Sequence, residues 1–229
     1  MRPSHLLTLV ATLAAFTASA QDGTPSLEGV GRISIQGGWR YAANTTFYDS
    51  SYRYIVSQPG NEALTRSGAS RGGPLLTGTF AYGISDLVEI GIDLFGYGQR
   101  IQLTGQAPLT TAGYGALIGL RFRSWLDIGP EGVVPFLGLL TGPLLAAAAF
   151  EGQPLRETFS QAWGGTVGAT FRLTPTWGIS AEFRQVFARG AVGRMDQNFG
   201  SFNAGGSWLT IGVNYTFPKD FGSSSKLPF

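Results

Sequence analysis

Seven charged residues have types and positions that could support chemistry, because each lies in an otherwise apolar stretch of the chain. They are Glu89, Asp93, Arg121, Arg123, Arg172, Glu182 and Arg184. Two carboxyl groups such as those of Asp93 and Glu182 can act together as a general acid and a general base. Arginines are expected nearby, with side chains pointing to the same side of the predicted strands. A carboxylate beside arginines is more often part of a structural ion pair. We therefore expect an ionic network rather than a catalytic pair.

Other kinds of site have little to rest on. The sequence holds one histidine, His5, and no cysteine. Serine and cysteine nucleophiles usually need an imidazole base, and transition-metal sites usually need histidine or thiolate ligands. The formal net charge is +2 and the basic residues are scattered, which disfavours a nucleic-acid partner. We expect a protein that is not an enzyme and has no metal site and no cofactor.

The segment 207–217 shows how the charged side chains are positioned. Large apolar residues alternate there with small polar ones, with a period of two, as in a strand whose two faces differ. The polar face carries neither lysine nor glutamate, although a strand facing water usually would. Its length and pattern are typical of a strand that crosses an outer membrane in a closed barrel. The apolar face consists of Leu209, Ile211, Val213, Tyr215 and Phe217.

Seven further segments predict the rest of such a barrel, at about residues 30–41, 76–84, 88–102, 114–123, 133–150, 163–173 and 177–187. Only 13% of the residues are charged, against roughly a quarter in a typical soluble protein. Segment 133–150 has no charge and the length of a membrane helix, but Pro135 and Pro143 and its alternating neighbours favour a strand. We predict an all-β fold, a closed antiparallel transmembrane β-barrel of about eight strands in an up-and-down meander, because an open sheet would leave unpaired backbone groups in lipid.

The connections and the first residues indicate how the chain is oriented. Short turns near Asp86, Gly129 and Pro175 alternate with long loops, of which residues 42–73 and about 189–206 are the longest. Residues 1–20 read as a secretory signal peptide cleaved after Ala20, so the mature chain would hold no histidine. We expect a short periplasmic segment at 21–28, the barrel at 29–217, and a periplasmic tail at 218–229. The long loops are then extracellular.

The alternation and aromatic ending of segment 207–217 resemble the closing strand of the small outer-membrane β-barrel family, which includes OmpA-like and OmpW-like barrels. The resemblance implies a location in the outer membrane of a Gram-negative cell, with outer-membrane lipid around a monomeric barrel. It also implies that the closing strand, with Leu209, Ile211, Val213, Tyr215 and Phe217, is the signal read by the barrel-assembly machinery. Barrel enzymes of similar size depend on a histidine, which the mature chain would lack.

The alternation of side chains along the strands also predicts which residues face the inside of the barrel. We expect the seven charged residues to form an ionic network in the lumen, with Asp93 opposite Arg121 and Glu182 between Gly168 and Gly212. We expect an apolar patch beside it, formed by Phe95, Tyr97, Leu117, Leu137 and Leu139. Three functions remain open: a structural or surface barrel plugged by side chains, a narrow channel for small or apolar solutes, and surface recognition or adhesion through the loop at 42–73.

Overall fold

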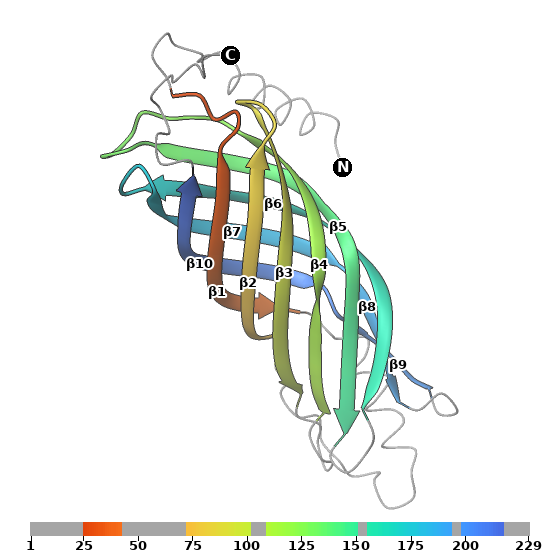
Figure 1. The fold of residues 1–229 in the computed structure, drawn as a ribbon. Helices are drawn as coiled ribbons and strands as arrows, with labels where there is room; N and C mark the ends of the chain where they lie inside the picture. The colour runs from red at the N-terminus through yellow and green to blue at the C-terminus, as the bar shows by residue number, and fades with distance from the viewer. Residues whose placement is uncertain (1–24, 43–71, 102–108, 151–154, 194–197, 218–229) are drawn as a thin grey trace, which may run out of the picture.

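Eight strands of the computed structural model close into a barrel in which each strand is antiparallel to its neighbours (Figure 1). The structure describes residues 25–42, 72–101, 109–150, 155–193 and 198–217. Strands follow one another around the barrel in chain order, and β1 pairs with β10 to close it. The strands of the barrel are β1 (Gly31–Tyr41), β2 (Gly72–Gly83), β3 (Val88–Ile101), β4 (Leu109–Arg123), β5 (Val133–Phe150), β6 (Arg156–Arg172), β7 (Trp177–Phe187) and β10 (Gly206–Phe217).

The predicted fold class is therefore confirmed, as a closed eight-stranded meander. The uncharged segment 133–150, whose length would also suit a membrane helix, is strand β5. No helix within the described part of the chain is long and apolar enough to cross a membrane. The turns 84–87, 124–132 and 173–176 lie at one end of the barrel, which we call the turn end, and we call the opposite end the loop end.

The outside of the barrel is apolar and the inside is largely polar. Side chains alternate between exposed and buried along most strands, so that Ile33 and Ile35 of β1 are exposed while Arg32, Ser34 and Gln36 are buried. An exposed apolar band around a closed barrel is the arrangement expected of a lipid-facing surface. The band includes Phe80, Ile90, Ile92, Leu94, Ile118, Leu120, Val167, Phe171, Phe183, Leu209, Ile211 and Val213.

Strand β5 contradicts one prediction about which side chains face the lumen. Leu139 was expected in the lumen, but its side chain is 70% exposed and lies beside Leu120 on the outer face. Leu137 pairs with Phe122 on the same outer face and is also misassigned. The buried residues of this part of β5 are Phe136 and Leu140. The error has a simple origin, because both faces of β5 are apolar and the alternation that would reveal its register is missing.

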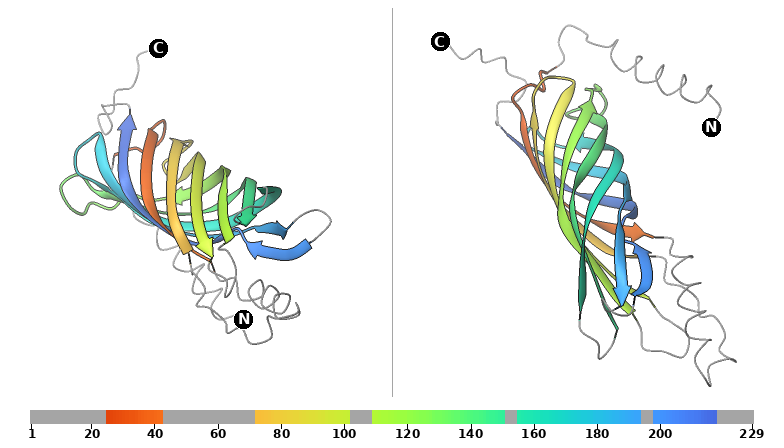
Figure 2. Two further views of the ribbon diagram at one scale, coloured as in Figure 1. Left: turned by 90° about the horizontal axis from the view of Figure 1, so that it is seen from below. Right: turned by 90° about the vertical axis from the view of Figure 1, so that its right-hand side faces the viewer.

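The predicted loop at 189–206 is also wrong in part, because most of it is an ordered hairpin. Strands β8 (Arg189–Gly193) and β9 (Asn198–Asn203) form a separate two-stranded sheet. The hairpin lies at the loop end, where β6 extends beyond its neighbour β7 (Figure 2). The backbone N–H of Ala191 donates to Thr158 Oγ1 of β6 at 3.4 Å, so the hairpin is bonded to this extension.

At the turn end, one aspartate anchors the segment that enters β1. Asp86 accepts hydrogen bonds from Ser26 Oγ and from the backbone N–H groups of Leu27 and Glu28 at 2.6 to 3.1 Å. Partial burial raises the pKa of the Asp86 carboxyl, but these hydrogen bonds outweigh that effect and hold the pKa below its ordinary value. The chain before β1 is thereby fixed across the turn between β2 and β3.

Candidate functional site

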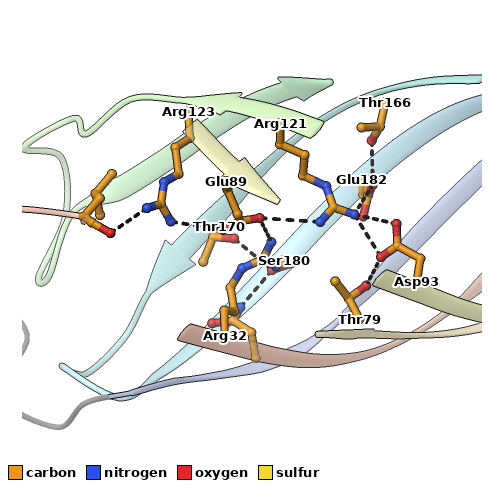
Figure 3. A network of polar contacts seen from close by, with 12 residues as sticks. Arg32, Thr79, Glu89, Asp93, Arg121, Arg123, Thr166, Thr170, Ser180 and Glu182 are labelled. Carbon is orange, nitrogen blue, oxygen red and sulfur yellow. Dashed lines mark hydrogen bonds and ion pairs between the residues drawn. The ribbon is translucent and has the colours of Figure 1, made fainter. Parts of the chain in front are cut away.

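The centre of the lumen is crossed by a balanced network of two arginines and two acids. Arg121 Nη2 lies 2.7 Å from Asp93 Oδ2, and Arg184 Nε lies 2.7 Å from Glu182 Oε1. Arg184 Nη1 lies 3.3 Å from Asp93 Oδ2, and Arg121 Nη2 lies 3.9 Å from Glu182 Oε1, so each arginine faces both acids. These residues come from β3, β4 and β7, and Figure 3 shows Arg121, Asp93 and Glu182 converging.

Hydroxyl groups complete the coordination of the two central acids. Thr79 Oγ1 donates to Asp93, and Thr166 Oγ1 donates to Glu182, each at 2.5 Å. All four charged side chains are at least 98% buried. A buried charge is tolerated only when it is paired and hydrogen-bonded, and here every carboxylate has such partners. The acids are therefore fully engaged in structure.

A second group of charges lies between this centre and the turn end. The carboxylate of Glu89 forms ion pairs with Arg32 Nη2 at 2.7 Å, Arg123 Nη1 at 3.1 Å and Arg121 Nη1 at 3.5 Å (Figure 3). Arg123 also donates from Nη2 to the backbone carbonyls of Leu27 and Ser85. Arg172 is buried nearby and donates to the carbonyl of Pro175. The seven predicted network residues thus lie inside the barrel, with Arg172 at its edge rather than among the acids.

Two predicted registers are wrong, although the side chains concerned do meet or lie close. Arg121 is paired directly with Glu89, and Asp93 is paired with Leu117, so Arg121 reaches Asp93 diagonally along the strand. Glu182 lies beside Gly168 as predicted, but its other neighbour is Thr210 rather than Gly212. Both errors concern the register between strands, because the observed pairings of β3 with β4 and of β7 with β10 differ from those that symmetrical connections would give.

The half of the lumen toward the loop end is mostly apolar, although Arg40, Gln99 and Thr111 are also buried there. Phe95, Tyr97 and Leu117 of the predicted patch are buried there. In place of the two leucines of β5 that face outward, the remaining positions are filled by Leu140, Leu144 and Trp208. The ring centroids of Phe95 and Trp208 are 4.9 Å apart.

Trp208 has no exposed surface, and it was missed as a lumen residue. The signal was present in the sequence, because position 208 has the parity of Thr210 and Asn214, which belong to the small polar face of β10. Among the residues that the structure describes, its indole Nε1 has no hydrogen-bond partner.

The mouth at the loop end is covered by the chain between β9 and β10. The hydroxyl of Tyr97 donates to the carbonyl of Ala204, and the guanidinium of Arg40 donates to the carbonyls of Asn203 and Gly205. The backbone N–H groups of Ala204 and Gly205 donate to the carbonyl of Ala188. Segment 203–205, which we call the cap, is therefore bonded both to the barrel wall and to the chain before β8.

The predicted assembly-signal residues lie on the outer face of β10. Leu209, Ile211 and Val213 are exposed, and Tyr215 and Phe217 are partly exposed toward the turn end. The rings of Trp177 and Tyr215 lie 5.2 Å apart, and those of Phe80 and Phe217 lie 6.4 Å apart. These aromatic side chains gather at one rim of the apolar band, where rings are stable at a membrane interface.

The described residues contain no group of three or more histidines, cysteines or acids that could hold a metal ion. Recognition or adhesion through the loop at 42–73 was one of the open alternatives, and residues 43–71 of that loop lie outside the described part of the chain. The side chains of the lumen therefore form an ionic layer toward the turn end and a mostly apolar layer toward the loop end.

Comparison with known proteins shows which barrels have this architecture. Neisserial surface protein A (NspA) has a TM-score of 0.51 at 17% sequence identity, over 83% of this chain and 98% of that one. The outer membrane protein OprG from Pseudomonas aeruginosa has a TM-score of 0.51 at 13% identity, over 86% of this chain and 99% of that one. The fold is that of the small outer-membrane barrels. No family model matches the sequence, and no curated protein matches it.

The barrel therefore combines this fold with an apolar exterior suited to lipid. At these identities the likeness extends to the architecture alone. Any function has to be argued from the lumen and the surface of this chain.

Proposed function

We propose that the protein is an integral outer-membrane barrel that is not an enzyme and whose lumen is closed to solutes by its own side chains. Its role is then that of a structural or surface protein. The observation that carries the proposal is the complete burial of Arg121, Arg184 and Asp93 across the middle of the bore. A water-filled channel would expose at least part of its lining charges.

The two layers of the lumen support closure independently. In the ionic layer, each acid bonds an arginine and a threonine or several arginines, so no carboxylate is left to act as a base or to guide a cation. In the apolar layer, Trp208, Leu117 and Leu144 are fully buried. A hydrated ion crossing this second layer would lose its water among largely apolar side chains, because the buried polar groups of Arg40 and Gln99 are bonded to each other.

The proposal includes an address and a topology. A signal peptide cleaved after Ala20 would deliver the chain to the periplasm, and the assembly machinery would insert a monomer with the turn end facing the periplasm. The apolar band and its aromatic rim at Tyr215 and Phe217 support insertion into lipid. Cell fractionation tests this part, and recovery of the mature chain among soluble periplasmic proteins would contradict it.

Conductance across a planar lipid bilayer tests the closure. The refolded barrel should give no stable current steps. Glu182→Ala, which removes one acid from the centre, should produce steps that favour anions, because the lumen is then more positive. Glu157→Ala provides a matched control, because Glu157 is an exposed acid of β6 and its loss should produce no current steps.

Stable steps from the unmodified barrel would favour the alternative of a narrow channel, and cation preference in Glu182→Ala would contradict the assigned charge balance. The apolar layer gives the channel alternative its specific form, a path for apolar solutes. A hydrophobic fluorescent probe that binds the native barrel, and loses binding when Leu144 is replaced by Asp, would support that alternative over a plug.

A further inference from the structure

We infer that the loop-end part of β6 is a docking edge, at which an extended segment of a partner protein adds to the barrel wall as a further strand. The docking edge consists of residues 157–161, beyond the point where the pairing with β7 ends. It is separate from the lumen and from the loop at 42–73. The inference rests on the proposed orientation, in which the loop end faces the outside of the cell.

Strand β6 has a strand neighbour on only one side along this stretch. Its pairing with β5 continues as far as Arg156, whereas its pairing with β7 ends at Trp163 and Phe187. Within the described part of the chain, no strand takes the place of β7 beyond that point. The β8–β9 hairpin turns inward instead, because a Cβ added at Gly190 would lie 2.8 Å from the Cβ of Ala146 on the inner face of β5.

The backbone groups of β6 can be assigned to its two sides from the hydrogen bonds at its turn end. The N–H of Arg172 donates to the carbonyl of Gly132 on the β5 side, and the N–H of Leu173 donates to the carbonyl of Trp177 on the β7 side. The direction of these groups alternates along a strand. Even-numbered residues of β6 therefore point toward β5, and odd-numbered residues point toward β7.

Three residues direct their backbone groups to the side where no strand follows: Glu157, Phe159 and Gln161. The register between β5 and β6 is continuous from Val133 to Ala148, so the alternation holds over the whole strand. Among the residues that the structure describes, none donates to or accepts from the N–H and C=O groups of these three. Unpaired backbone groups are not tolerated in hydrocarbon, so this part of β6 lies outside the bilayer.

The usual protection of a strand edge is missing here. Natural sheets often guard their edges with lysine or proline, and residues 157–161 contain neither. Their one charged side chain, Glu157, accepts a hydrogen bond from the hydroxyl of Tyr114 at 3.1 Å. Tyr114 belongs to β4, on the far side of β5, so the carboxylate is turned away from the docking edge.

The chemistry of the docking edge specifies an extended polypeptide as its occupant. Donors and acceptors recur at every second residue, about 7 Å apart, and another strand presents groups with the same spacing. The side chain of Phe159 is 66% exposed on the outer face beside Leu145. It offers an aromatic neighbour to an apolar residue of the added segment.

A second copy of this barrel does not suit the docking edge. Strands of such barrels are tilted by roughly 35 to 45°. Two copies in one membrane are related by an axis along the membrane normal, so their β6 strands would cross at about twice this angle and could not pair. The occupant is therefore a segment of another protein.

Amide exchange of the unmodified full chain in lipid nanodiscs tests whether the docking edge is open. The N–H groups of Glu157, Phe159 and Gln161 should exchange at least about tenfold faster than those of Thr158 and Ser160, which point toward β5. Equal protection of the two sets would overturn the inference, because the edge would then already be covered.

Binding is tested with a labelled seven-residue peptide of alternating valine and threonine, and with a twin that is N-methylated at every residue. The parent peptide should bind the unmodified barrel at millimolar concentration and slow the exchange at Phe159 and Gln161. The twin has no N–H donors and should not bind. Absence of binding by the parent, or equal binding by the twin, would overturn the inference.

Two variants at one position separate the backbone from the side chain. Phe159→Pro removes an N–H that β5 does not use, so the barrel should keep its gel mobility, and Phe159→Ala keeps that N–H. The parent peptide should bind Phe159→Pro at least about tenfold more weakly than Phe159→Ala, and equal affinities would overturn the inference. Neither result depends on conductance, so failure of this inference and failure of the proposed closure are distinguishable.

Discussion

Replacing Glu182 with alanine is the sharpest test of the lumen network. The Glu182 side chain is 2% exposed and accepts three short hydrogen bonds, from Arg184 Nε at 2.7 Å, Arg184 Nη2 at 2.9 Å and Thr166 Oγ1 at 2.5 Å. Arg184 has no exposed surface, and once Glu182 is removed the acid that remains in contact with it is Asp93, 3.3 Å away. Asp93 already binds Arg121, so Arg184 would have to share its remaining carboxylate with a second buried cation.

Breaking a buried ion pair by removing one partner costs about 3 to 5 kcal/mol, and we expect Glu182→Ala to lie near the lower value because Asp93 remains in reach. The free energy of unfolding is measured by urea titration in lipid vesicles and by the temperature at which gel mobility changes on heating. Glu182→Gln keeps the size of the side chain and removes only its charge. Its free energy of unfolding should lie between those of the unmodified barrel and Glu182→Ala. Exposed ion pairs are worth roughly 0 to 1 kcal/mol, so a Glu182→Ala loss within that range would refute the network.

Three further predictions concern other parts of the barrel. Ile211→Arg should cost about 2 to 4 kcal/mol of folding free energy in vesicles, because this exposed side chain faces lipid near the middle of β10, whereas Ile211→Ala should cost far less. Tyr97→Phe should cost about 1 to 3 kcal/mol by leaving the buried carbonyl of Ala204 without its donor, and amide exchange of the cap should quicken; unchanged exchange would show that the cap is held elsewhere. The pKa of Asp86 is lowered by its hydrogen bonds, so they stabilise the segment before β1 above a pH of about 3.9 and are lost as pH falls through the lowered pKa, which should reduce the amide protection of Leu27; Asp86→Ala should show that reduced protection at neutral pH.

The sequence is enough to predict the barrel because its strands differ on their two faces. In β1 and β10 the alternation of large apolar and small or charged residues matches the exposed and buried positions of the structure. Apart from the exposed Arg100 near the loop end of β3, the charges in β3, β4 and β7 mark the inside directly, because a charged side chain in lipid is costly. The identity of the residues that meet in the lumen could therefore be predicted without knowledge of the register.

The rest could not be predicted, because it depends on contacts between distant parts of the chain. Strand β5 is apolar on both faces, so Leu137 and Leu139 could be assigned to either side. The diagonal contact between Arg121 and Asp93 depends on the pairing of β3 with β4, which sequence spacing alone does not determine. The β8–β9 hairpin has no alternating apolar pattern of its own and is bonded instead to Thr158 and Ser160 of β6.

The positions of the inward charges also bear on how the barrel assembles. A slip of one residue in a strand exchanges its inner and outer faces. Nine charged side chains of the described strands are buried in the lumen, on β1, β3, β4, β6 and β7. If a slip turned them toward the middle of the bilayer, each of the six arginines would cost about 2 to 4 kcal/mol and each of the three acids somewhat less. Strands β2, β5 and β10 carry no charge, and each of them lies between two strands that do. The charged strands therefore help to fix the alignment of their uncharged neighbours. A barrel in which a charged strand had slipped by one residue would be less stable in the membrane than the correctly aligned barrel.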